Sequence, residues 1–251
     1  LRADYVEAEA LFRRALAIGE ATHGTAFPRI AYVNNLGRVL RDRGDLDGAE
    51  DAFRRALANW ESTHGDNHPV VAILVSNIGG VLLDRGDLDG AEDAYRRAHA
   101  IGEAAYGTDH PQVAMYANNL GIVLRARGDL DGAEGAYRHA LATGEVAYGA
   151  DHPYVAVYTR NLGRVLQNRG DLGGAEDAYR RALGINETAY GPGHPEVAID
   201  VANLGSLLQD RGDLDSAEDA FRRALDIFER KLGPDHPNTQ IVRDHLASLR
   251  S

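Results

Sequence analysis

Histidines recur in this sequence at a regular spacing that invites comparison with a metal site. A His precedes a Pro at His68, His110, His152, His194 and His236. Metal ligands must converge at about 2 Å from one ion, and residues that lie one structural repeat apart cannot do so. We therefore expect these histidines to mark the starts of helices, and we expect the protein to hold no metal and no cofactor.

The tripeptide Arg-Gly-Asp also recurs, beginning at Arg43, Arg85, Arg127, Arg169 and Arg211. It matches an adhesion tripeptide, and the following Asp-Leu-Asp-Gly weakly resembles a calcium loop. A calcium loop of the EF-hand type needs acidic residues at positions 1 and 12, where this sequence has Arg43 and Arg54. We expect instead a tight turn, in which Gly ends one helix and Asp caps the next.

Signatures of catalytic sites are missing, including Gly-x-Ser-x-Gly, His-Glu-x-x-His and a phosphate-binding loop with Lys. Carboxylates lie instead four residues before arginines, a spacing that stabilises helices by about 0.2–0.5 kcal/mol per pair. These pairs are Glu50–Arg54, Asp51–Arg55, Glu92–Arg96, Asp93–Arg97, Glu218–Arg222 and Asp219–Arg223. The sequence therefore predicts a protein that is not an enzyme.

Composition narrows the class of partner. Of the 251 residues 44 % are hydrophobic and 26 % are charged, as in ordinary folded proteins. No apolar run is long enough to span a membrane, and a net charge of −11 disfavours nucleic acid. The absence of cysteine fits a cytoplasmic protein. Because Leu1 falls inside a helical pattern, we expect the chain to be part of a longer protein.

A repeat of 42 residues sets the architecture. Gly-Asp-Leu begins at Gly44, Gly86, Gly128, Gly170 and Gly212. In one copy, Pro111 opens a helix with apolar residues at helical spacing, and Asp129 or Asp131 caps a second helix that ends near Tyr148. Such hairpins must stack to bury their apolar faces. The sequence predicts an all-α, right-handed α-solenoid of antiparallel helix hairpins.

Glycines inside the first helix of each hairpin predict close packing, because a mid-helix glycine costs about 1 kcal/mol relative to alanine. They are Gly37, Gly79, Gly121, Gly163 and Gly205. We expect one solenoid over residues 1–251, with an unpaired second helix at 1–22 and a capping helix at 237–251 whose Arg243, Asp244 and Arg250 face water. The five hairpins between them are expected at 28–63, 69–106, 111–148, 153–190 and 195–232.

The motifs Asn-Leu-Gly-x-Val-Leu, Arg-Gly-Asp-Leu and Ala-x-x-x-Tyr resemble the signature of the tetratricopeptide repeat (TPR). The 42-residue period, with His-Pro-x-Val-Ala and Tyr-Arg-Arg-Ala-Leu, is similar to the repeats of kinesin light chains. The resemblance implies a concave face, lined by the first helices, that binds an extended or helical polypeptide. It also implies that the Asn before Leu-Gly contacts the ligand backbone, at Asn35, Asn77, Asn119, Asn161 and Asn203; His245 and Ala247 depart from this pattern.

The asparagines themselves allow two interpretations. Asn is a mediocre helix former, and its amide can pair with either the donors or the acceptors of a peptide backbone. A row of amides would therefore suit peptide binding, but the same amides could instead bond to the neighbouring helix and space the repeats.

Residues beside this row differ from copy to copy, which predicts either specificity or neutral drift on an exposed face. The candidates for binding are Asn34, Asn118, Arg38, Arg41, Arg125, Arg160, Arg164 and Asn168. Because Arg forms bidentate pairs with carboxylates, we expect a protein or peptide partner that carries carboxylates.

Three functions are compatible with these features of the sequence. The leading one is a scaffold that binds a polypeptide, as the sensing or recruitment part of a larger protein. The alternative is self-association through exposed solenoid ends, where Leu11, Leu16 and Ile18 lack a partner hairpin. An RNA-binding helical repeat is disfavoured by the negative charge.

Overall fold

The computed structural model describes residues 9–14, 18 and 30–249. Several expected features lie outside these residues. They are the start of the first hairpin at Pro28, most of the expected helix at 1–22 including Leu16, and Arg250. The helices with defined bounds are α2 (Ile30–Asp42), α3 (Leu46–His64), α4 (Pro69–Arg85), α5 (Leu88–Tyr106), α6 (Pro111–Ala126), α7 (Leu130–Tyr148), α8 (Pro153–Asn168), α9 (Leu172–Tyr190), α10 (Pro195–Asp210), α11 (Leu214–Leu232) and α12 (Pro237–Ser248).

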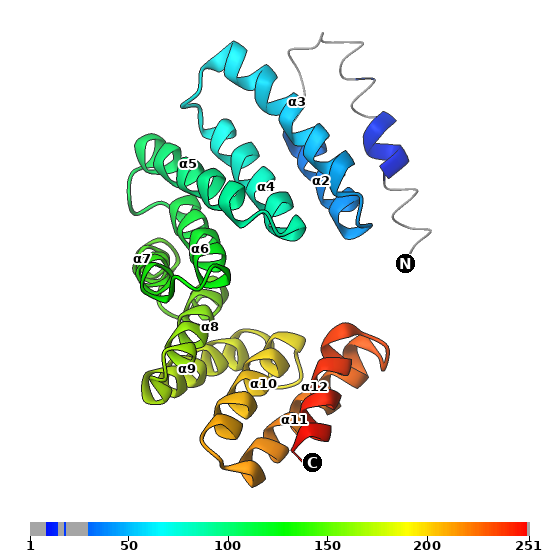
Figure 1. Ribbon diagram of the computed structural model, residues 1–251, viewed down its shortest axis with the longest axis vertical. Coiled ribbons are helices and arrows are strands. Elements are labelled where there is room, and N and C mark those ends of the chain that lie inside the picture. The colour runs from blue at the N-terminus through cyan, green and yellow to red at the C-terminus, as the bar shows by residue number, and fades with distance from the viewer. Residues whose placement is uncertain (1–8, 15–17, 19–29, 250–251) are drawn as a thin grey trace. The chain divides into compact units, whose positions relative to one another are not determined.

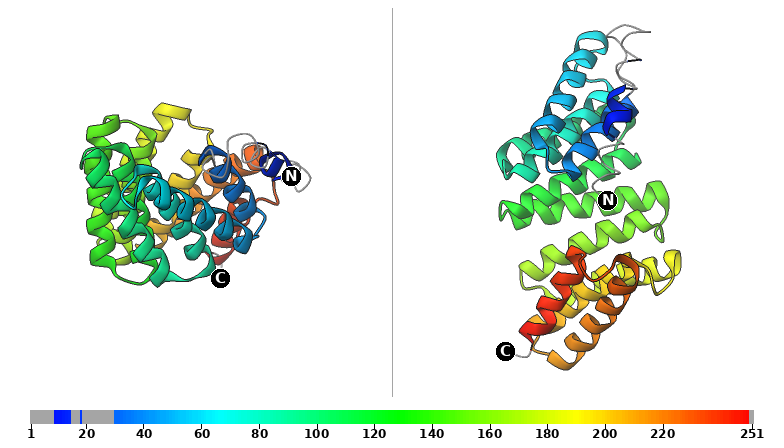
Figure 2. Two further views of the ribbon diagram at one scale, coloured as in Figure 1. Left: turned by 90° about the horizontal axis from the view of Figure 1, so that it is seen from above. Right: turned by 90° about the vertical axis from the view of Figure 1, so that its right-hand side faces the viewer.

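The chain divides into two compact units, residues 1–127 and 128–251. Within each unit every helix packs against the next one along the chain (Figures 1 and 2). We call the even-numbered helices of a unit its A layer and the odd-numbered helices its B layer. In the A layers, α2 also contacts α4, and α8 contacts α10. The predicted all-α architecture of stacked helix hairpins is confirmed.

Each A helix from α4 onward begins at a His-Pro pair, as predicted. The Nδ1 atom of His110 accepts a hydrogen bond of 3.2 Å from the backbone N–H of Gln112, and Pro111 occupies the first helical position. The ring of His110 also stacks on Tyr106, with centroids 4.2 Å apart. The same cap is formed by His68, His152, His194 and His236.

The Arg-Gly-Asp turns join the two helices of each hairpin. Gly128 has a φ of +82°, which favours glycine, and the carboxylate of Asp129 accepts the N–H of Gly132 at 2.9 Å. The cap is therefore Asp129 and not Asp131. Asp45, Asp87, Asp171 and Asp213 cap their helices in the same way.

The Arg of each turn contacts the preceding B helix. Arg85 pairs with Asp47 and Glu50 of α3, and Arg127 pairs with Asp89 and Glu92 of α5. In the second unit, Arg169 pairs with Asp131 and Glu134, and Arg211 pairs with Glu176 and the Leu172 carbonyl. These arginines tie one hairpin to the next, which supports the structural interpretation of the tripeptide over adhesion.

Mid-helix glycines of the A helices α4, α8 and α10 face aromatic rings of the following B helices. A Cβ atom added to Gly163 would lie 2.8 Å from the ring of Tyr179, and one added to Gly205 would lie 2.9 Å from Phe221. Gly79 stands in the same relation to Tyr95. Because all three rings are buried, the predicted close packing is confirmed at these positions.

Two of the predicted ion pairs within helices are wrong. Arg97 pairs at 2.5 Å with Glu61 of the preceding B helix, and Arg223 pairs with Glu187, rather than with Asp93 and Asp219. The long arginine side chain reaches a partly buried carboxylate across the helix boundary, where water screens the attraction less. The pairs Glu50–Arg54, Asp51–Arg55, Glu92–Arg96 and Glu218–Arg222 form as predicted.

Helix α12 carries long polar side chains at two positions whose residues are buried in the A helices α4, α6, α8 and α10. Gln240 is exposed, although the equivalent residues Ala72, Ala156 and Ala198 are fully buried. Arg243 takes the register of buried Val75 and Val201 but pairs with Glu229, so it does not simply face water. Asp244 is exposed. These replacements give α12 a hydrophilic face.

Candidate functional site

The predicted asparagines lie on the A helices. Asn35, Asn77, Asn119, Asn161 and Asn203 are all half-buried. The Nδ2 of Asn77 donates to the Oδ1 of Asn34 at 2.8 Å, and the Nδ2 of Asn119 donates to the Oγ of Ser76 at 3.4 Å. Each bond joins one A helix to the preceding one, so these amides contribute to repeat spacing. An amide offers two donor hydrogens and an acceptor oxygen, so one such bond does not exhaust its capacity.

The predicted arginines differ in their surroundings. Arg41 pairs with Asp84 at 2.6 Å, and Arg160 pairs with Glu196 and Asp200 at 3.0 Å each. Arg38 and Arg164 are exposed and Arg125 is half-buried. Of the two remaining candidates, Asn118 is buried and Asn168 is exposed at the end of α8. Part of the variable face is therefore used in contacts between repeats.

One group of the predicted residues converges in the first unit. A hollow of about 240 Å³ is lined by Phe53 and by five of the predicted residues, namely Asn34, Asn35, Arg38, Arg41 and Asn77. Three amides and two guanidinium groups are thus held near one buried aromatic ring by α2, α3 and α4. We call this the α2–α4 hollow. Its donors suit carboxylates and peptide carbonyls, and its amide oxygens suit peptide N–H groups.

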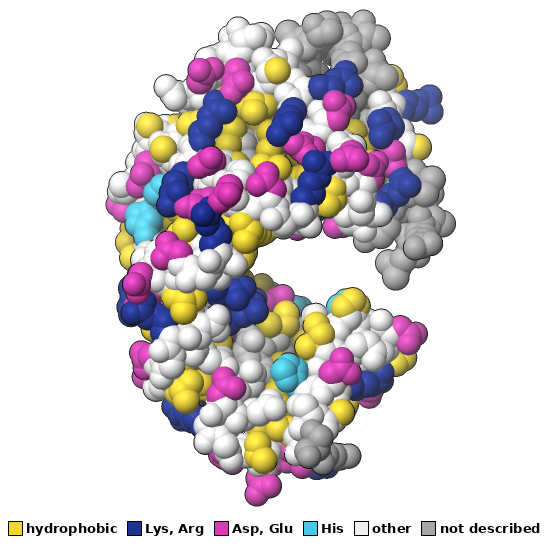
Figure 3. Space-filling view, viewed as in Figure 1, with side chains coloured by type: hydrophobic (Ala, Val, Ile, Leu, Met, Phe, Trp, Pro, Cys, Tyr) yellow, Lys and Arg dark blue, Asp and Glu magenta, His cyan; other side chains and the backbone are white. Residues whose placement is uncertain are grey.

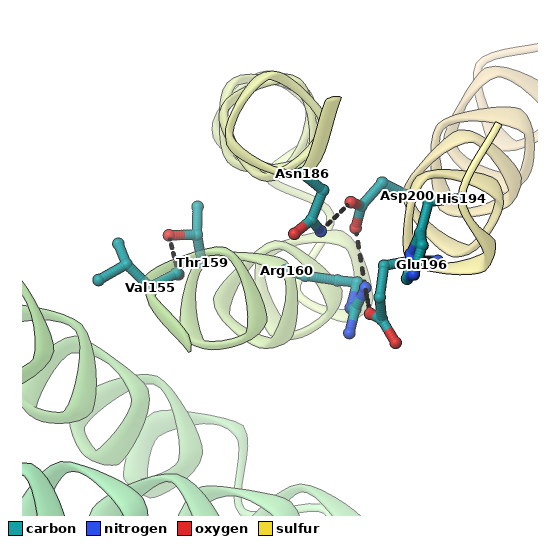
Figure 4. A network of polar contacts seen from close by, with 7 residues as sticks. All are labelled: Val155, Thr159, Arg160, Asn186, His194, Glu196 and Asp200. Atoms are coloured by element: carbon teal, nitrogen blue, oxygen red, sulfur yellow. Dashed lines mark hydrogen bonds and ion pairs between the residues drawn. The ribbon is translucent and has the colours of Figure 1, made fainter. Parts of the chain in front are cut away.

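A buried polar network in the second unit was not predicted (Figure 4). The carboxylate of Asp200 is fully buried and accepts hydrogen bonds from Asn186 at 2.6 Å and Arg160 at 3.0 Å. Burial raises the pKa of Asp200 above its ordinary value of 3.8, and the charge of Arg160 and the bond from Asn186 oppose that shift. Arg160 therefore belongs to a structural network in addition to its predicted face.

The repeat contains a signal for this network. Asp200 occupies the register of Tyr116 and Tyr158, and Asn186 occupies that of Gly102 and Gly144. In the earlier copies the tyrosine ring lies against the glycine, where an added Cβ would be 2.8 Å from the ring. The two positions change together, so a comparison of the copies could have identified the pair.

Comparison with known families agrees with this geometry. Models of the tetratricopeptide repeat match residues 70–145, 117–188, 161–230 and 196–251, and also 1–29 and 30–70. The chain belongs to the tetratricopeptide repeat family. This family and fold are typically non-catalytic scaffolds that mediate protein–protein interactions. No protein with a curated description matches the sequence.

Solved structures similar to this TPR protein include BtubC (BKLC) from P. vanneervenii, with a TM-score of 0.74 and 24 % identity over 94 % of this chain and 92 % of that one. The nearly identical TPR-like repeats of a Podosopora anserina protein described as a kinesin light chain match with a TM-score of 0.69 and 17 % identity, over 83 % and 98 % of the chains. MamA protein matches with a TM-score of 0.52 and 20 % identity, over 82 % and 96 %. The predicted α-solenoid and its kinesin-light-chain-like repeat are thereby confirmed.

Hydropathy adds one finding about the part of the TPR chain that the structure describes. None of its helices combines the length and the apolar character that crossing a membrane requires.

Proposed function

We propose that this TPR protein binds a polypeptide segment along its A layer, without catalysis, as the sensing or recruitment part of a larger protein. The observation that carries the proposal is the α2–α4 hollow, where predicted amide and guanidinium groups converge. The typical role of the family in protein–protein interactions supports it. The partner segment would be extended or helical, and its backbone would pair with the side chains of Asn35 and Asn77.

The charge of the hollow favours a partner with carboxylates. Arg38 is exposed and forms no ion pair with any residue that the structure describes, whereas Arg41 is already paired with Asp84. An unpaired guanidinium can take a carboxylate in a bidentate pair, which is among the stronger charge-assisted hydrogen bonds.

The test begins with peptides selected from a displayed random library against the whole chain. Their affinity is then measured by calorimetry in rising salt. We expect Arg38→Gln to weaken binding roughly tenfold, the equivalent of about 1.4 kcal/mol, and we expect added salt to weaken binding to the wild type. Arg55→Gln in the B layer is the matched control and should leave the affinity unchanged. Selected peptides that bind equally to Arg38→Gln, or whose affinity ignores salt, would contradict the proposal.

A second variant separates recognition from spacing. Replacing Asn77, Asn119 and Asn161 together by Ala should weaken peptide binding by about 0.5–1.5 kcal/mol per lost hydrogen bond, while the circular dichroism spectrum stays helical. If the triple variant unfolds instead, the asparagines serve to space the repeats.

Self-association is a second candidate, because Leu11 and Ile18 are 59 % and 54 % exposed. The hydrophilic face of α12 disfavours stacking at that helix. Sedimentation velocity at several concentrations checks this candidate. A monomer at every concentration, or a dimer unaffected by Leu11→Glu with Ile18→Glu, would exclude it.

A further inference from the structure

Two apolar hollows lie between neighbouring B helices, one in each unit. The hollow of the first unit has a volume of about 440 Å³ and lies between α3, α4 and α5, and its apolar part is formed by Leu57, Ala58, Val75, Ile78 and Ala94. Charged side chains of these helices surround it, and Figure 3 shows hydrophobic side chains enclosed by basic and acidic ones on this surface. A hollow of about 330 Å³ lies between α9, α10 and α11 in the second unit. We call these the outer hollows.

The outer hollows are equivalent in sequence. Seven of the nine residues that line the first hollow have a counterpart three 42-residue periods later in the lining of the second. The equivalent pairs are Arg54 and Arg180, Leu57 and Leu183, Val75 and Val201, Ile78 and Leu204, Asp93 and Asp219, Ala94 and Ala220, and Arg97 and Arg223. Both volumes fall within the range of about 300–1,000 Å³ that is typical of ligand pockets.

Two arginines and two carboxylates line each outer hollow, but one carboxylate of each forms no ion pair with a described residue. Their arginines already have carboxylate partners, since Arg54 pairs with Glu50 and Arg97 with Glu61, while Arg180 and Arg223 pair with Glu176 and Glu187. Asp93 and Asp219 are exposed and form no ion pair with any described residue. Each outer hollow therefore offers an apolar floor beside one unpaired carboxylate.

We infer that the outer hollows bind basic amphipathic segments of another protein. A large aliphatic or aromatic side chain enters the hollow, and a Lys or Arg one helical turn away pairs with Asp93 or Asp219. The net charge of −11 disfavours a second copy of this chain as the occupant and favours a basic partner. This surface lies in the B layer and prefers the opposite charge from the α2–α4 hollow, so it goes beyond the proposed function.

The test uses three synthetic helical peptides with the whole chain. The first carries a Leu with a Lys four residues later on one face, the second has Glu in place of each Lys, and the third has Ala in place of the Leu. We expect the first peptide to bind and to shift the methyl NMR signals of Leu57, Val75, Leu183 and Val201. The second and third should bind at least about tenfold more weakly, since each loses a charge pair or a buried apolar anchor.

Asp93→Arg with Asp219→Arg should weaken binding of the first peptide at least about fivefold and strengthen binding of its Glu counterpart. Asp66→Arg with Asp235→Arg is the matched control, because it makes the same change of net charge at exposed loop residues, and it should reproduce neither effect. The inference is wrong if the first and third peptides bind equally or if both double variants behave alike. It is also wrong if the chain alone forms a dimer that Asp93→Arg with Asp219→Arg dissociates, because the occupant is then a second copy.

Discussion

At the scale of single residues, the contact between an A-helix glycine and a B-helix ring sets how closely the two helices of a hairpin approach. The ring of Tyr179 is fully buried and its hydroxyl donates to Gln167 at 2.8 Å. The ring therefore has little freedom to move aside for a larger side chain at Gly163. Interiors this densely packed respond to the addition of even one methyl group.

Gly163→Ala should lower the free energy of unfolding by about 1–2 kcal/mol, because overpacking outweighs the gain in helix propensity. Gly184→Ala is the matched control in α9, where an added Cβ meets no atom within 4 Å. It should raise the free energy of unfolding by about 1 kcal/mol. Urea denaturation measures both, and a stabilised Gly163→Ala variant would show that the ring yields.

We expect a substitution at Asn186 to compensate for the loss of stability that a substitution at Asp200 causes. Asp200→Tyr alone would press a ring onto Asn186 and should destabilise the protein by about 1–3 kcal/mol. Adding Asn186→Gly recreates the arrangement of Tyr158 on Gly144 and should recover most of the loss. A double variant no more stable than the single one, as judged by thermal denaturation, would show that the two positions are not coupled.

The raised pKa of Asp200 predicts how its contribution depends on pH. A carboxyl whose pKa is higher in the folded protein stabilises fully below its unfolded pKa, and this stability is lost as the pH rises through the folded pKa. Asp200→Asn removes the titration. The free energy of unfolding of this variant minus that of the wild type should therefore increase over the pH range that begins at about 4, the ordinary pKa of an aspartate. Urea denaturation across that range checks it, and a decreasing difference would contradict the assignment.

At the scale of helices, starts and ends follow from local chemistry. A single repeat is enough to predict these boundaries. It has proline at the first helical position, a side-chain acceptor before it, and glycine after the last turn. The caps at Asp129 and His110 illustrate this. The partner of Arg97 was not predictable, because a side chain of this length can extend to Asp93 in its own helix or to Glu61 in the previous B helix. Packing decides between them, and Arg97 pairs with Glu61.

The candidate site was predictable in part. The sequence places the asparagines on one register, but a half-buried amide can bond to a neighbouring helix and to a ligand, so its role does not follow from spacing. The hydrogen bond from Asn77 to Asn34 depends on how the two helices pack, so it could not be predicted from the sequence. The network of Asp200 was not predicted, because Asp200 and Asn186 both differ from the Tyr and Gly that the two preceding repeats have at these positions.

His110 provides a prediction for the helix caps. Replacing it by Ala removes the acceptor for the N–H of Gln112 and should lower the free energy of unfolding by about 1 kcal/mol. His110→Asn keeps a capping oxygen and should lose less. The difference between Asn and wild type then reports the stacking of His110 on Tyr106. Equal losses in the Ala and Asn variants, measured by urea denaturation, would argue against the cap.

At the scale of the whole molecule, stability is a sum of local terms, because each hairpin contacts only its neighbours in a repeat array. Arg85→Gln removes the link from its turn to α3, and Arg211→Gln removes the link to α9. We expect hydrogen exchange to quicken in α3–α5 for the first variant and in α9–α11 for the second, with a loss of about 1 kcal/mol in local stability. Uniform loss of protection in both variants would indicate one cooperative unit instead.

The hydrophilic face of α12 limits how the array can be lengthened. A duplicated hairpin inserted between α11 and α12 would meet buried residues of α10 such as Ala198 and Val201. The same hairpin fused behind α12 would dehydrate the amide of Gln240 and separate Arg243 from Glu229. An engineer who wants a longer protein should therefore splice new modules into the interior, or first restore alanine at Gln240 and valine at Arg243.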